Sequence, residues 1–176
     1  MRLFADDVVN FPKERVYLTQ RDAMPNLVAY LPNVEWIKVL EREDLVGGAR
    51  ILNLWKGADS DVPRLLRPFV KPEVMQWKDH AQWSDADHHV DWRLEVGIFT
   101  EQVDIRGRTT FTDAGADKCR VLLDGNLIID QKSLPGVPKL LASKVVGEVE
   151  KFIVKLLTPN LTAVNRGIEV YLSKQG

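Results

Sequence analysis

Side chains able to bind a metal ion or move a proton gather in one short stretch, Asp85-Ala86-Asp87-His88-His89, with His80 and Asp91 close by. Imidazole and carboxylate groups are common metal ligands. Adjacent residues of a strand point to opposite faces of a sheet, however, so His88 and His89 are poorly placed to hold one ion. A polar turn that leads into a strand accounts for the cluster. We therefore predict no metal site and no cofactor.

Asp79 is a stronger candidate for chemistry, because its predicted strand turns the carboxylate toward an apolar face. In a hairpin of residues 75–83 and 88–96, alternation puts Asp79 on the same face as Trp77 and Trp92. A buried carboxylate must be paired, hydrogen-bonded or neutralised by a raised pKa, and such groups gather at binding and catalytic sites. The alternatives are a register displaced by one residue, or an ion pair between Asp79 and an arginine.

The register of this hairpin decides which side chains meet. A four-residue loop over residues 84–87 predicts that Trp83 faces His88 and that Asp79 faces Trp92. The opposite face then presents Lys78 and other polar side chains to water.

Other catalytic signatures are absent from the sequence. It contains no Gly-x-Ser-x-Gly motif, no phosphate-binding glycine loop and no His-Glu-x-x-His motif. Cys119 falls at an inward strand position, where a thiol is usually inert packing. With one cysteine and no apolar leader after a basic start, we expect a cytoplasmic protein.

Composition excludes several classes of protein. The chain of 176 residues has 24 basic and 25 acidic residues, and its net charge is -1. A sequence-independent nucleic-acid binder needs a surplus of positive charge, so we expect no nucleic-acid partner. Charged residues interrupt every long apolar run, which predicts no membrane span. In the absence of repeats or linkers we treat residues 1–176 as one domain.

The elements that must position these residues follow from the period of the apolar pattern. Period two predicts strands at residues 2–10, 34–42, 49–56, 103–111 and 119–129, beside the hairpin. The last strand is expected to bend or bulge at Gly125. Short helices are predicted over residues 12–19 and 22–31, the second capped by Asp22. A long helix is predicted from Val137 to about Leu157, and Pro159 either kinks it or begins a new helix.

The connection over residues 59–74 is broken by prolines and mixes apolar with basic side chains. Leu65, Leu66, Phe69 and Val70 lie among Arg64, Arg67 and Lys71. This mixture suits a mobile gate or a transient contact with a membrane surface. The alternative is a loop whose apolar side is docked on the protein.

The order of these elements resembles the START-like (SRPBCC) helix-grip superfamily, which includes polyketide cyclases and lipid-transfer domains. The resemblance covers nearly the whole chain and includes the Asn10-Phe11-Pro12 start of the first helix and the break over residues 134–138 before the last one. Within the superfamily the chain is most similar to bacterial members. The resemblance implies an α+β fold in which a curved antiparallel sheet of six to seven strands wraps around a long C-terminal helix and leaves a cavity.

We therefore expect binding or transport of a hydrophobic small molecule or lipid between sheet and helix, at a mostly apolar site with few polar anchors. The expected cavity residues are Trp77, Asp79, His88, Trp92, Leu94, Ile105, Phe111, Val121, Leu141 and Val145. An alternative is a cyclase or dehydratase that uses Asp79, with His88 or Tyr30, as acid and base. A third reading is a module that acts through protein partners.

Overall fold

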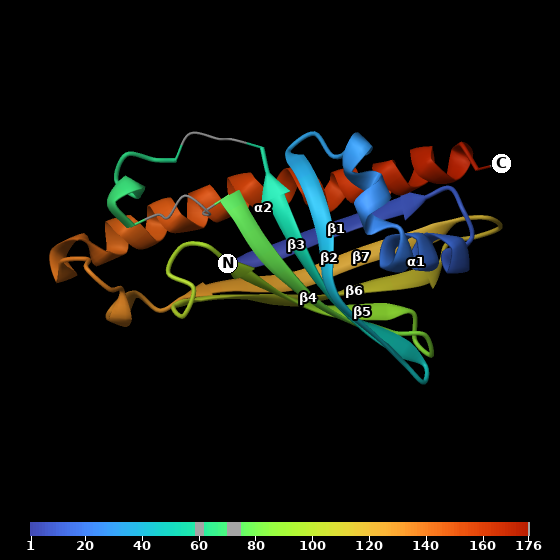
Figure 1. Cartoon of the computed structure of the whole chain (residues 1–176), viewed down its shortest axis with the longest axis horizontal. Coiled ribbons are helices and arrows are strands. Elements are labelled where there is room, and N and C mark those ends of the chain that lie inside the picture. The colour runs from blue at the N-terminus through green and yellow to red at the C-terminus, as the bar shows by residue number, and fades with distance from the viewer. Residues whose placement is uncertain (59–61, 70–74, 176) are drawn as a thin grey trace.

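A seven-stranded antiparallel sheet forms the larger part of the molecule (Figure 1). The computed structural model describes residues 1–58, 62–69 and 75–175. The sheet order is β1-β7-β6-β5-β4-β3-β2, so neighbours along the chain are mostly neighbours in the sheet. The strands are β1 (Arg2–Val9), β2 (Val34–Leu45), β3 (Gly48–Gly57), β4 (Gln76–Ser84), β5 (His89–Val96), β6 (Val103–Asp113) and β7 (Cys119–Ile129).

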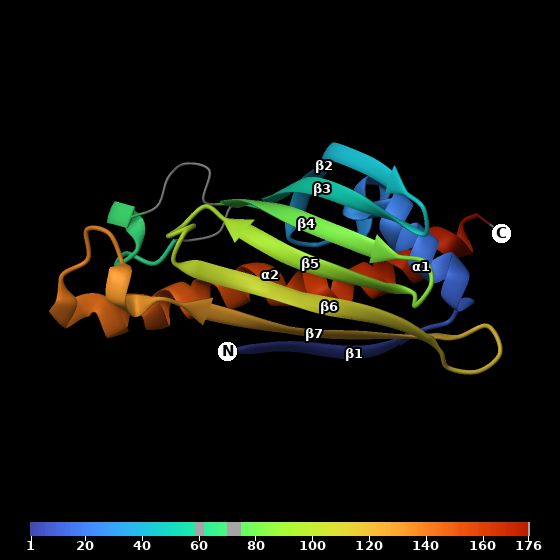
Figure 2. The ribbon, with the colours of Figure 1, turned by 90° about the horizontal axis from the view of Figure 1, so that it is seen from below.

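Helices lie against one face of this sheet. The helix α1 (Lys13–Asp22) and the 3-10 helix η1 (Met24–Tyr30) follow β1, and shorter 3-10 turns occur later at η2 (Arg67–Phe69), η4 (Gln131–Ser133) and η5 (Lys139–Leu141). The C-terminal helix α2 (Ala142–Ser173) runs behind the sheet along its length (Figure 2). The predicted helix-grip α+β architecture is therefore confirmed.

Alternation along the strands buries the residues that were predicted to face inward. Ile105, Thr109 and Phe111 of β6 are buried, as are Val121 and Leu127 of β7. The apolar residues among them belong, with the apolar face of α2, to one hydrophobic core between sheet and helix. Burial of this apolar surface is the main favourable contribution to folding.

The hairpin of β4 and β5 keeps its predicted faces but not its predicted register. Trp83 pairs with Val90 and Asp79 pairs with Leu94, so each residue meets a partner two positions further along β5 than predicted. The turn includes His88, whose φ of 47° is left-handed. Because side chains alternate with period two, a shift of two residues changes the partners without turning any side chain to the other face.

Gly125 does not mark a bulge, which corrects the sequence interpretation. The pairing of β7 with both β6 and β1 is continuous, and Gly125 pairs with Gly107 of β6. A Cβ atom on either glycine would lie 2.5 Å from a ring carbon of Trp92. The two glycines therefore leave room for the indole, and a close approach explains them better than a bend.

Two helix predictions also need correction. Asp22 ends α1 instead of capping a second helix, and its carboxylate binds Arg21 and Arg42. The long helix begins at Ala142, later than predicted, and continues through Pro159 to Ser173. Its start leaves Leu141 at the N-cap with 42% of its surface exposed.

Candidate functional site

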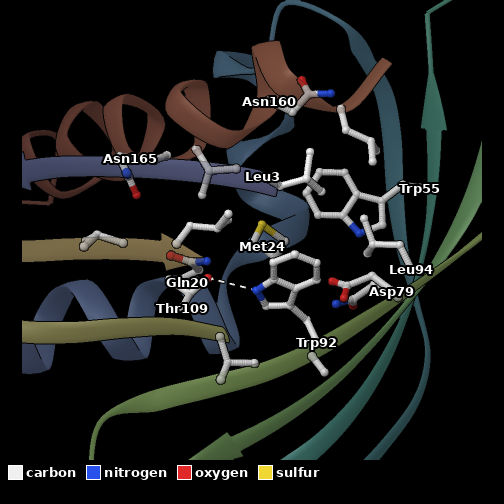
Figure 3. Close-up of a pocket in the computed structure, with 18 of the residues that line it drawn as sticks. Leu3, Gln20, Met24, Trp55, Asp79, Trp92, Leu94, Thr109, Asn160 and Asn165 are labelled. Carbon is white, nitrogen blue, oxygen red and sulfur yellow. Dashed lines mark hydrogen bonds between the residues drawn. The ribbon is translucent and has the colours of Figure 1, made fainter. Parts of the chain in front are cut away.

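A cavity of about 110 Å³ lies between the middle of the sheet and the C-terminal half of α2 (Figure 3). Six strands and all three longer helical elements contribute to its wall. The lining residues are Leu3, Ala5, Gln20, Met24, Asn53, Trp55, Trp77, Asp79, Ala81, Trp83, Val90, Trp92, Leu94, Thr109, Val121, Leu123, Leu157, Asn160, Val164 and Asn165.

Tryptophan rings form much of this wall. Trp55 and Trp77 stack with ring centroids 5.6 Å apart. The indole of Trp92 lies over the Gly107–Gly125 pair, and its Nε1 donates a hydrogen bond of 3.1 Å to the Thr109 hydroxyl. This bond and the close glycine contact hold the Trp92 ring in one orientation at the edge of the cavity.

Asp79 is the acidic residue of the cavity wall. Burial penalises the charged carboxylate and raises the pKa of Asp79 from 3.8 to about 6, while the nearby Asn53 and Trp55 side chains favour the charged form and oppose the rise. The Trp55 indole faces the carboxylate without making a bond of good geometry. No ion pair joins Asp79 to another described residue, so the arginine alternative is not found within the described part of the chain. Because desolvation is the largest influence, the pKa of Asp79 lies close to neutral pH.

Five buried polar atoms in the described part of the chain have no hydrogen-bond partner, and the residues that carry them all line the cavity. They are Gln20 Oε1, Asn53 Oδ1, Trp55 Nε1, Trp83 Nε1 and Asn160 Oδ1. A buried polar atom without a hydrogen-bond partner destabilises the fold, and such atoms are rare in native proteins. Water or a ligand in the cavity would supply hydrogen-bond partners for these five atoms.

Asn160 reaches the cavity through an irregularity of α2. Pro159 has no N–H group, so the hydrogen bond to the carbonyl four residues earlier is missing inside the helix. The Asn160 side chain folds back along the helix, where its Nδ2 donates to the Leu156 carbonyl at 3.1 Å. Its Oδ1 stays unpaired, and the residue is 5% exposed.

Half of the predicted cavity residues line this space, namely Trp77, Asp79, Trp92, Leu94 and Val121. The other five lie elsewhere in the structure, namely His88, Ile105, Phe111, Leu141 and Val145. The main reason is that the cavity faces residues 157–165 of α2 and not the first turns of the helix. Leu141 is half exposed, whereas Val145 and Ile105 are packed in the core.

His88 and Phe111 belong to the contact between α1 and the sheet. Tyr17 of α1 packs edge-on against both rings, at centroid distances of 5.1 Å and 5.4 Å. His88 Nε2 lies 2.6 Å from Glu14 Oε2. Tyr30, the other acid or base considered, accepts a hydrogen bond from Lys174 at 3.0 Å and does not line the cavity. The predicted acid and base pair is therefore not assembled.

The site is more polar than the sequence interpretation expected. Apolar periodicity does not identify the polar lining residues, which are Gln20, Asn53, Asn160 and Asn165. Asn53 nevertheless shares the inward phase of Ile51 and Trp55 in β3. A polar residue at an inward position of a strand is the sequence signal for such a site.

Other sequence expectations concern metals and membranes. The described residues contain no cluster of three or more His, Cys, Asp and Glu side chains able to hold a metal ion. None of the helices in the described ranges is long and apolar enough to cross a membrane.

The described part of the connection over residues 59–74 has its apolar side packed on the protein. Leu66 is fully buried, and the Phe69 ring lies 5.6 Å from that of Phe99. Val70 and Lys71 lie outside the described residues. The docked loop, which was the alternative, therefore describes residues 62–69.

Comparisons with known proteins agree on the fold. No protein-family model matches the chain, and no curated protein matches it significantly in sequence. Among solved structures, the protein TTHA0849 from Thermus thermophilus is 21% identical, with a TM-score of 0.66 over 100% of this chain and 99% of that one. The Zhui aromatase/cyclase from Streptomyces sp. R1128 is 14% identical, with a TM-score of 0.66 over 96% and 93%.

A third solved structure, a START superfamily protein from Mycobacterium smegmatis, is 14% identical, with a TM-score of 0.51 over 99% of each chain. These likenesses extend over nearly the full length of the chain. The chain therefore has the START-like helix-grip fold that its element order predicted.

Proposed function

We propose that this START-like domain binds a compact hydrophobic small molecule, about the size of one aromatic ring, in the cavity between the sheet and α2. The cavity itself carries the proposal, because about 110 Å³ of space lined mainly by aromatic and aliphatic side chains lies inside the fold. An engineered apolar cavity of roughly 150 Å³ in another protein binds benzene. Structural similarity to an aromatase/cyclase supports a ligand with a ring.

The volume of the cavity is too small for a whole lipid, which the sequence interpretation had included among the possible ligands. Sites for drug-sized ligands occupy about 300–1,000 Å³. A whole lipid or a polycyclic molecule therefore requires the present cavity to enlarge. For a ligand of about eight heavy atoms, a contribution of roughly 0.6 kcal/mol per atom corresponds to a Kd of about 0.3 mM.

Isothermal titration calorimetry with p-xylene, naphthalene and a long-chain fatty acid tests the proposal. We expect saturable binding of p-xylene at one site and weaker binding of the larger molecules. Ala81→Leu adds a side chain to the cavity wall and should abolish this binding. Ala86→Leu makes the same change at an exposed position of the β4–β5 turn and should leave binding intact. Failure of a folded protein to bind any of the three would favour a protein-interaction module instead.

A second candidate function, a cyclase or dehydratase, is favoured by one observation. Asp79 has a pKa of about 6 inside an apolar cavity, which suits a general acid or base near neutral pH. A molecule that co-purifies with the protein, identified by native mass spectrometry, supplies the substrate to assay. An enzyme should lose turnover in Asp79→Asn and keep binding, whereas a carrier has no turnover to lose.

We also propose that the protein acts in the cytoplasm. Buried, unpaired Cys119 is compatible with a reducing compartment.

A further inference from the structure

The chemical character of the ligand can be inferred from the unpaired polar atoms of the cavity, and this inference rests on the proposed function. We infer that the ligand is a single ring that carries a hydroxyl group, and that this group donates a hydrogen bond to the amide oxygen of Asn160 or Asn53. A purely hydrocarbon ligand would leave these oxygens unsatisfied. The preferred ligand class is therefore phenols and related hydroxylated rings.

The two asparagines provide the evidence, because both are nearly inaccessible and both face the cavity. Asn53 is 4% exposed and Asn160 is 5% exposed, and the Oδ1 atom of each has no partner among the described residues. Gln20 Oε1, contributed by α1, is a third unpaired acceptor in the same wall. These three acceptors come from three different elements, so they surround the space instead of forming one local cluster.

The assignment of oxygen and nitrogen in both amides follows from their neighbours. Asn160 Nδ2 donates to the Leu156 carbonyl, which can only accept, so the oxygen is the atom left unpaired. The Asn53 side chain favours the ionised Asp79 carboxylate, which can only accept, so its NH2 group is the side turned toward Asp79 and its oxygen is left without a partner. Turning either amide by 180° would replace a hydrogen bond by a contact between two acceptors.

Two indole groups indicate a hydroxyl and not an amine. Trp55 Nε1 and Trp83 Nε1 are unpaired donors in the same wall, whereas the Trp92 indole is already bonded to Thr109. Trp55 lies between Asn160 and Asp79 (Figure 3). A hydroxyl group can donate to an amide oxygen and accept from an indole, but a protonated amine can only donate.

Ordered water would satisfy the same atoms, and the experiment must separate the two occupants. Calorimetric titration of the unmodified protein with p-cresol and with 4-methylanisole does so. The methyl ether has lost the donor but has one more carbon atom, so p-xylene, which has as many heavy atoms as p-cresol and no donor, is the control for size. We expect p-cresol to bind about tenfold more tightly, since the ether oxygen would face acceptors. In a cavity that prefers hydrocarbon, the hydroxyl would instead weaken binding because its desolvation is not compensated.

A variant assigns the preference to a residue. Asn160→Leu should reduce p-cresol affinity about tenfold and leave 4-methylanisole unchanged, while Asn33→Leu at an exposed position should change neither. Equal affinities of the unmodified protein for the two ligands, or tighter binding of the ether, would overturn the inference. That comparison uses no variant, so misfolding cannot obscure it. Absence of binding by both ligands and by p-xylene would instead refute the proposed function.

Discussion

Replacing Asp79 by asparagine should stabilise the protein at neutral pH. The folded protein holds the pKa of Asp79 at about 6, against an ordinary value of 3.8. Between these values the native state binds more protons than the unfolded state, so stability falls as pH rises through this window. Below pH 3.8 the carboxyl is neutral in both states, and above pH 6 the full cost of the buried charge is present. A difference of this size corresponds to about 3 kcal/mol.

The neutral amide of Asp79→Asn removes that cost at nearly constant volume. We expect the free energy of unfolding of the variant to exceed that of the unmodified protein by about 3 kcal/mol at about pH 7.5 and by about 1 kcal/mol at about pH 4.5. Urea denaturation at both pH values measures the differences, and the pH dependence of other groups cancels when variant and unmodified protein are compared. Asp117→Asn, at an exposed turn, should change stability by less than about 0.5 kcal/mol. A variant that is less stable at the higher pH would refute desolvation as the dominant influence on Asp79.

Three further predictions concern packing and reactivity. Gly125→Ala should cost about 1–3 kcal/mol in urea denaturation, because the new methyl group meets the Trp92 ring, while Gly147→Ala, with open space beside it, should gain up to about 1 kcal/mol. Phe152→Ala should lower the free energy of unfolding by about 3–5 kcal/mol, because the ring is buried. Leu140→Ala, at a 98% exposed position, should lower it by less than about 0.5 kcal/mol. Equal losses of stability in the two variants would mean that the buried face of the helix is misassigned. Cys119, whose pKa burial raises to about 11, should react with a thiol reagent at about pH 8 only on unfolding, and rapid labelling of the native protein would contradict this.

Faces of strands were predictable from the sequence, while registers and contacts were not. Alternation alone put Trp77, Asp79 and Trp92 on the inner face, and the structure agrees. The partners across β4 and β5 differ from the prediction by two residues because the four-residue turn, which includes left-handed His88, spans residues 85–88 instead of 84–87. Side chains of a strand alternate with period two, so a register shift of two residues leaves the same side chains facing inward.

The position of the cavity along α2 depended on information that periodicity does not contain. Val145, Phe152 and Leu156 lie on one buried face of α2, but the part of this face that borders a space depends on how α1 and the sheet pack around it. The sequence left open whether Pro159 kinks the long helix or begins a new one, and in the structure one helix continues through it. Asn160, at that irregularity, became part of the wall.

Diffraction from crystals soaked in iodobenzene tests the central claim most directly. The iodine atom gives an anomalous signal that locates a ring-sized molecule without reference to any assay. We predict a peak inside the cavity, among Met24, Trp92 and Leu94. Peaks confined to the surface, with ordered water filling the cavity, would contradict binding of a compact hydrophobic molecule at this site.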